Sequence, residues 1–138
     1  MAGPEVRAAG YLLSRGRGAA ERFLLLCNRD RGEWGFPKGH ARSGEPLPSC
    51  ARRECAEECG IGLVAVAPGS WELAYALPDG RRKRVVYYRA VTAQEAVTLS
   101  REHREAAWVP VVEVARRLPF ASLRALFRRH LEEREPPC

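Results

Sequence analysis

The sequence predicts an α+β fold with a single domain. Candidate strands come first, one helix follows them, and further strands then precede a helical C-terminal part. This segregated order is typical of the α+β class. The chain has 138 residues, which is about the size of one domain, and it shows no internal repeat or linker. We expect residues 1–138 to form one domain with frayed ends at about 1–5 and 134–138.

Two apolar segments near the start of the chain are predicted to be strands. Residues 7–14 form the first, and residues 22–27 form a short apolar run of strand length. A continuous apolar run is typical of a strand that is buried on both faces. The segment between them, residues 14–21, is rich in glycine and arginine and should turn. The two strands could therefore pair as a hairpin, and a polar loop is expected over 28–33.

A helix is predicted to follow, beginning at Pro46 or Pro48 and ending before Gly60. Proline fits the first turn of a helix, because the amide hydrogen that it lacks has no partner there. Glycine suits the position just after a helix end. These signals predict a helix of about 12 residues, near the average for globular proteins.

The C-terminal half predicts strands and then helices. Strands are expected over 62–77 (in one or two pieces), 82–91 and 105–109, with a strong turn signal at 78–81. Pro110 opens a short helix predicted over 111–117. Apolar residues at helical spacing predict an amphipathic helix over 120–133 that packs on a sheet. We expect Trp34 to pack in the core and His130 to lie at the surface or at the helix end.

The chain has five cysteines and no visible signal peptide. An odd count without a signal peptide argues for free thiols and for a cytoplasmic protein. Cys55 and Cys59 are four residues apart and share a predicted helix face with Ala51. They could ligate zinc, but no second ligand pair of suitable spacing accompanies them. Burial against the core is therefore the favoured interpretation.

Three glutamates on the predicted helix form the main candidate for a functional site. Glu54, Glu57 and Glu58 are spaced i, i+3 and i+4 and therefore share one stripe. Like charges on one stripe destabilise a helix, whereas a divalent cation above the stripe reverses that effect. Carboxylate oxygens, with other positions left to water and phosphate, are what Mg²⁺ prefers. The Gly-rich segment 37–45 lets backbone groups approach a metal or a phosphate closely.

Residues 39–61 resemble the Nudix box, G-x5-E-x7-R-E-U-x-E-E-x-G-U, where U is a bulky apolar residue. Ile61 fills the last apolar position, and Cys55 fills the first as a mild departure, because cysteine is a small hydrophobe. The alternative, a solvated acidic helix face, does not explain seven fixed residues at fixed spacing. The fixed positions that match are Gly39, Glu45, Arg53, Glu54, Glu57, Glu58 and Gly60.

The resemblance implies a Nudix fold, in which a mixed β-sheet is sandwiched between α-helices. It also implies Mg²⁺- or Mn²⁺-dependent hydrolysis of a phosphoanhydride in a nucleoside diphosphate linked to another group. Glu54, Glu57 and Glu58 are then expected to ligate the metal, with the Gly39 carbonyl as an extra ligand. Two further box residues, Glu45 and Arg53, would orient the helix and its glutamates through ion pairs. The general base would be Glu54 or, from a loop outside the box, Glu102.

Residues around the box resemble the asymmetrical diadenosine tetraphosphate hydrolases, which cut that substrate into ATP and AMP. The resemblance covers about residues 7–130. Lys38 and Lys83 could bind phosphates as point charges, and His40 could donate a hydrogen bond to one. Tyr75 or Tyr87 could stack on adenine, although either could instead pack in the core. The motifs that carry the resemblance are 37–40, Tyr75, 83–88, 99–103 and Trp108.

Other substrates stay open at this point: 5′-triphosphorylated RNA, nucleoside triphosphates and inositol polyphosphates. A catalytically silent nucleotide-binding module is a third possibility, but lost glutamates would favour it and all are present. The net charge of +6 is compatible with polyanions, yet no alternation of aromatic and basic residues marks a nucleic-acid track. We expect a small nucleotide substrate, no membrane and no stable nucleic-acid partner, in a monomer or dimer.

Overall fold

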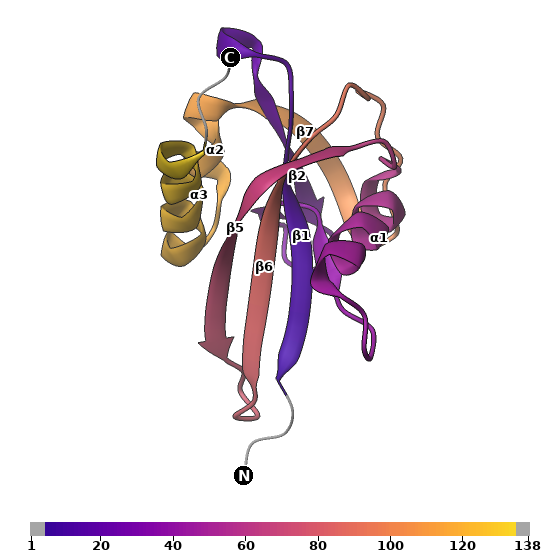
Figure 1. Cartoon of the computed structure of the whole chain (residues 1–138), viewed down its shortest axis with the longest axis vertical. Helices are drawn as coiled ribbons and strands as arrows, with labels where there is room; N and C mark the ends of the chain where they lie inside the picture. The colour runs from indigo at the N-terminus through magenta and orange to yellow at the C-terminus, as the bar shows by residue number, and fades with distance from the viewer. Residues whose placement is uncertain (1–4, 135–138) are drawn as a thin grey trace.

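A computed structural model describes residues 5–134 as one mixed sheet with helices on both faces (Figure 1). A 3-10 helical turn, Gly18–Ala20, joins the first two strands. Among the described residues, no helix is long and apolar enough to cross a membrane. The elements in chain order are β1 (Val6–Arg15), β2 (Arg22–Asn28), β3 (Trp34–Gly35), β4 (Lys38–His40), α1 (Leu47–Cys59), β5 (Ala65–Ala76), β6 (Arg82–Val91), β7 (His103–Pro110), α2 (Val111–Arg117) and α3 (Ala121–Glu133).

The sheet has the strand order β3-β2-β1-β6-β5, with β4 paired to β1 and β7 paired to β2. Strand β1 lies in the middle and runs parallel to β6 over nine paired positions, from Val6 opposite Lys83 to Ser14 opposite Val91. The predicted hairpin of β1 and β2 is present only beside its turn, where two residue pairs match. The rest of β2 pairs with β7 instead.

Strand β2 shows why both faces of the sheet are covered. Successive side chains of a strand point to opposite faces. Phe23 and Leu25 belong to an apolar cluster that packs beneath α2 and α3. The alternate residues Leu24 and Leu26 belong to a second cluster beneath α1. The expectation that this strand is buried on both faces is confirmed, and the fold is the predicted α+β arrangement.

Helix α1 begins and ends where its sequence signals predict. Pro46 directly precedes it with an extended backbone, and Gly60 directly follows it at a φ of 71°, a left-handed conformation that glycine adopts without steric cost. The helix packs on the sheet through small buried residues, which include Cys50, Cys55 and Cys59. The Cys55 and Cys59 sulfurs lie 3.7 Å apart within this apolar layer, as expected for packing residues.

The region 62–77 forms one strand rather than two. The pairing of β5 with β6 shifts register between Val66 and Ser70, which marks a β-bulge. Gly69 lies in this bulge at a φ of 109°, a conformation that side-chain-bearing residues rarely adopt. The last strand, β7, extends beyond the predicted 105–109 at both ends.

His130 lies in the last turn of α3, one of the two expected places, but it is not at the surface. It is fully buried, and its ring packs edge-on against Trp71 at a centroid distance of 4.8 Å. Trp34 packs against the core as a partly buried residue, whereas Phe36 lies within the core and is 3% exposed. The Trp34 ring is half-buried and lies 5.2 Å from the Arg117 guanidinium.

The ends of the described chain are tied to the body of the fold. Arg134 donates two hydrogen bonds of 2.8 Å to the two carboxylate oxygens of Glu21. This bidentate pair fixes the end of α3 against the turn between β1 and β2. Glu5 lies 3.9 Å from Arg82. Frayed ends were expected at about 1–5 and 134–138; of these, residues 1–4 and 135–138 lie outside the described residues, and Glu5 and Arg134 make the contacts above.

Candidate active site

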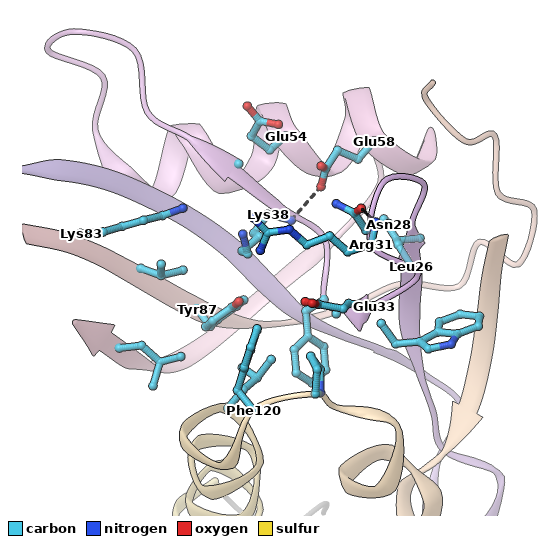
Figure 2. Close-up of a pocket in the computed structure, with 18 of the residues that line it drawn as sticks. Leu26, Asn28, Arg31, Glu33, Lys38, Glu54, Glu58, Lys83, Tyr87 and Phe120 are labelled. Carbon is cyan, nitrogen blue, oxygen red and sulfur yellow. Dashed lines mark hydrogen bonds between the residues drawn. The ribbon is translucent and has the colours of Figure 1, made fainter. Parts of the chain in front are cut away.

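A cavity of about 840 Å³ opens between α1, the loop leading into β4, the strands β5 and β6, and the start of α3 (Figure 2). It collects most of the residues that the sequence singled out, although they come from distant parts of the chain. Of the predicted residues, Lys38, Gly39, His40, Glu54, Glu58, Tyr75, Lys83, Tyr87 and Glu102 line it, whereas Glu45, Arg53 and Glu57 do not.

Glu58 is the most buried carboxylate of the site, at 6% exposed. One of its oxygens accepts a 2.8 Å hydrogen bond from the backbone amide of Lys38, and the other lies 3.9 Å from Nε2 of His103 (Figure 2 shows the first bond). Burial raises the pKa of Glu58 to about 8, against the opposing effect of the amide bond. A nearby cation would stabilise the ionised form of such a carboxyl, and residues with raised pKa values in a cavity are candidates for a functional site.

The donor set at this end of the cavity suits a divalent metal. Single ligating atoms of Glu58, Glu102 and His103 all lie within 4.8 Å of one another. Glu54 lines the same cavity from the preceding turn of α1. Carboxylate oxygens are the ligands of hard cations, and an imidazole nitrogen is also tolerated by Mn²⁺. Two carboxylates close together would otherwise repel, so the arrangement fits a bound cation.

Gly39 provides the space for one of these carboxylates. A side-chain carbon at this position would overlap the carboxyl group of Glu54. A larger residue here would therefore displace the Glu54 carboxylate from its place beside β4. The Gly39 carbonyl oxygen accepts a hydrogen bond from the Cys50 thiol at 3.4 Å, and Gly39 pairs with Ala9 in the β1–β4 ladder.

Arg53 connects the box residues that do not line the cavity. It binds both oxygens of Glu45 at 2.8 Å, and it also donates to Glu54 at 2.9 Å and to the His40 carbonyl at 3.1 Å. The Arg53 guanidinium lowers the pKa of Glu45 to about 2, mainly through these hydrogen bonds. The predicted ion pair is present, and it ties the loop before α1 to the helix.

Glu57 does not line the cavity, unlike the other two box glutamates. Its side chain is half-exposed and faces Arg53 at 3.2 Å and Arg42 at 3.7 Å. The same Arg53 nitrogen also donates to Glu54, so Glu57 lies beside Glu54 on its outer side. The structure thus brings Glu54, Glu58 and Glu102 together, and it places Glu57 at the outer edge.

Cationic side chains form the middle of the cavity. Burial, and next the neighbouring Lys38 ammonium, lower the pKa of Lys83 to about 8. The pKa of His40 is lowered by burial and by both lysines. Arg31 extends into the cavity beside Lys38 (Figure 2), and the sequence reading missed it because it lies in a polar loop. Cations held this close together are suited to a chain of phosphates.

Aromatic residues form the far wall. Tyr75 is 47% exposed and Phe120 is 52% exposed, and both line the cavity. Tyr87 is only 1% exposed and packs edge-on against Phe36 at 5.8 Å, so it forms the floor. The helical spacing of apolar residues predicts that Phe120 belongs to the apolar stripe of this helix. In the structure it directly precedes α3, and its ring faces the cavity instead.

Comparisons with known proteins agree with this geometry. The NUDIX domain matches residues 4–131. The asymmetrical bis(5′-nucleosyl)-tetraphosphatase of Sus scrofa is 31% identical over 135 residues, covering 89% of this chain and 91% of that protein. The "Putative mutator protein MutT4" of Mycobacterium tuberculosis is 40% identical over 102 residues, covering 71% of this chain but only 41% of its own length.

A solved structure shares the fold over nearly the whole chain. The C. elegans Ap4A hydrolase in its binary complex superposes with a TM-score of 0.84 at 29% identity, covering 92% of this chain and 96% of that one. Together with the domain match over nearly the whole chain, these similarities identify the fold and the chemistry. The chain belongs to the NUDIX domain family and is a Nudix hydrolase.

Proposed function

We propose that this protein hydrolyses dinucleoside polyphosphates, foremost diadenosine tetraphosphate, which it would cut into ATP and AMP with Mg²⁺ or Mn²⁺. One observation carries the proposal: a single cavity is lined by carboxylates, of which Glu58 is buried, by the cationic side chains of Lys38, Lys83 and Arg31, and by the exposed rings of Tyr75 and Phe120. A metal, a phosphate chain and a nucleobase each need one of these surfaces. The cavity volume of about 840 Å³ falls in the range of ligand sites.

Glu54, Glu58 and Glu102 would hold the metal. Glu57, which faces Arg53 from the outer edge, would contribute only after turning inward, and the Gly39 carbonyl would be an additional ligand. When bound, the cation would neutralise the phosphates and polarise the anhydride that breaks. The short distances among the ligating atoms of Glu58, Glu102 and His103 support this assignment.

Lys38, Lys83 and His40 would bind the phosphate chain. All three line the same cavity as the carboxylates and the exposed rings, so the phosphate chain would run along the cavity. Tyr75 would stack on a base that enters from solvent, with Phe120 beside it on the same wall. Each stacked base is worth about 1–3 kcal/mol.

The reaction itself is the addition of water to a phosphorus atom. The water oxygen forms a new P–O bond, the bridging anhydride P–O bond breaks, and the departing phosphate carries away the electron pair. A carboxylate accepts the proton from water. Glu54 and Glu102 are the two candidates for this base, because both line the cavity and both lie near Glu58.

The functions of two similar proteins support the substrate. The pig relative is a bis(5′-nucleosyl)-tetraphosphatase of the asymmetrical type, and the C. elegans neighbour is an Ap4A hydrolase. Both align with this chain over about nine-tenths of its length.

Three substrates would test the proposal. Diadenosine tetraphosphate, ATP and triphosphorylated RNA are incubated with wild type, Glu58→Gln and Glu132→Gln in Mg²⁺, and products are resolved by ion exchange. Glu132 is exposed on α3 and serves as the matched control. We expect ATP plus AMP from wild type and from the control only. Preferred release of pyrophosphate from RNA, or of phosphate from ATP, would replace the proposal with one of those substrates.

A further inference from the structure

The loop between β2 and β3 closes on itself through three hydrogen bonds around Asn28. The backbone amide of Asn28 donates to the Glu33 carbonyl at 2.8 Å, and its carbonyl accepts a hydrogen bond from the Gly32 amide at 2.9 Å. Its side-chain oxygen Oδ1 accepts the backbone amide of Arg31 at 2.8 Å. An asparagine that binds the backbone of its own turn in this way fixes the turn. Asn28 therefore fixes the direction in which the Arg31 side chain leaves the loop.

The same loop is attached to the turn that carries Glu102. The backbone amide of Arg29 donates to the Glu102 carbonyl at 2.8 Å, and Nε of Arg29 donates to the Arg101 carbonyl at 2.9 Å. Asn28 lies opposite His103 where β2 pairs with β7. Glu102 and His103 belong to the cluster of candidate metal ligands. The loop is therefore anchored beside these ligands.

Arg31 brings a positive charge from this loop into the cavity. It lines the cavity, whereas Arg29 of the same loop does not, and Figure 2 shows its side chain directed inward on the side of Lys38. The ion pairs of the site involve Arg53 and His103, and within residues 5–134 no carboxylate forms an ion pair with Arg31. Its side chain is exposed. The donors of its guanidinium are therefore available to an anion that enters the cavity.

We propose that Arg31 is a catalytic residue whose guanidinium binds the phosphate that departs when the anhydride breaks, with Asn28 as its positioning residue. The inference rests on the phosphoanhydride hydrolysis proposed above. When the bridging P–O bond breaks, the electron pair stays on the departing oxygen, where negative charge grows. The guanidinium donates hydrogen bonds to that phosphate and keeps its own proton throughout. These bonds strengthen as the charge grows, so Arg31 lowers the barrier more than it tightens substrate binding.

Steady-state kinetics of four proteins test the role of Arg31. The substrate is whichever of diadenosine tetraphosphate, ATP and triphosphorylated RNA the wild type hydrolyses fastest in Mg²⁺, and the variants are Arg31→Met, Arg31→Lys and Arg128→Met. Arg128 is an exposed arginine of α3 that does not line the cavity. We expect kcat of Arg31→Met to fall at least about tenfold, with a smaller change in KM. Lysine, which keeps the charge without the planar fork, should restore part of kcat, and Arg128→Met should match wild type.

A double-mutant cycle tests the role of Asn28. Asn28→Ala removes the acceptor that fixes the Arg31 amide, so kcat should fall in the wild-type background. It should fall no further in the Arg31→Met background, because Asn28 then has no catalytic side chain to position. An equal loss in both backgrounds would overturn the positioning role, since a merely structural effect of Asn28 does not depend on Arg31.

The kinetic results also separate this inference from the proposed function. A wild type that hydrolyses none of the three substrates would overturn the proposed function, and the inference with it. Hydrolysis by wild type with an unchanged kcat in Arg31→Met would overturn the inference alone, whether or not KM rises. A Tm of Arg31→Met close to that of wild type confirms that the variant is folded, as expected for an exposed side chain; should it unfold, Arg31→Lys decides by the same criterion.

Discussion

Replacing His130 by leucine should make the protein more resistant to acid. His130 is fully buried, and neither ring nitrogen has a hydrogen-bond partner among residues 5–134. Its neighbours are the rings of Phe23, Trp71 and Phe127. Burial, and next the charges of Arg134 and Arg89, lower the pKa of His130 to about 3.

The size of the effect follows from proton linkage. An unfolded histidine has a pKa of about 6.5, so between pH 6.5 and 3 the unfolded chain binds a proton that the folded chain does not. Stability is therefore complete above pH 6.5 and falls by about 1.4 kcal/mol for each unit below it. At pH 5 the loss through His130 alone is about 2 kcal/mol. Leucine removes this loss.

Urea unfolding at pH 7 and pH 5 measures the effect as a difference between proteins. Glu58 has the opposite sign, because its raised pKa makes the folded state gain stability on acidification between about pH 8 and 4.5. It is present in both proteins, so its contribution cancels. We expect the free energy of unfolding of His130→Leu, relative to wild type, to rise by about 2 kcal/mol between pH 7 and pH 5.

An exposed substitution on the same helix, Arg128→Leu, provides the control and should show no such change. A relative stability of His130→Leu that stays constant from pH 7 to pH 5 would refute the reasoning. It would mean that His130 is protonated in the folded state as readily as in the unfolded chain, for example because a hydrogen-bond acceptor stabilises the imidazolium.

Three further predictions concern the active site. Arg53→Lys keeps the charge but loses the paired contacts to Glu45 and Glu54. The kcat should therefore fall about 10- to 100-fold, while the Tm stays close to wild type. An unchanged kcat would count against a positioning role. Because the pKa of Lys83 is about 8, kcat/KM should decline above that pH, and Lys83→Arg should move the decline upward in a pH profile. Tyr75→Ala should raise KM about 5- to 150-fold with diadenosine tetraphosphate, an effect that Val112→Ala, also exposed, should lack.

Local signals made much of α1 and its surroundings predictable. Pro46 and Gly60 delimit the helix correctly, and the spacing of Glu54 and Glu58 places both on the cavity side. These features depend on neighbours within a few residues, so the sequence alone contains them. The position of Glu57 was less predictable, because its side chain faces Arg42 from the loop before α1 as well as Arg53 in the helix.

Long-range pairing was much less predictable. Nothing in residues 7–14 identifies β6 as the parallel partner of β1. The alternation of apolar residues in a strand shows which face is buried, but it does not show which other strand pairs with it. The burial of His130 could have been found, because it lies three residues after Phe127 on the apolar stripe. Its polar ring weighed against that reading. Arg31 carried no signal, because polar loops are generally exposed.

The layer of small residues beneath α1 allows the movement of this helix to be measured. Three thiols, those of Cys50, Cys55 and Cys59, are buried between this helix and the sheet, and Cys27 is buried within β2. A water-soluble disulfide reagent reaches them only when these elements separate. Labelling rates resolved by mass spectrometry would therefore show whether α1 detaches on its own, before the sheet opens, or only when the whole chain unfolds.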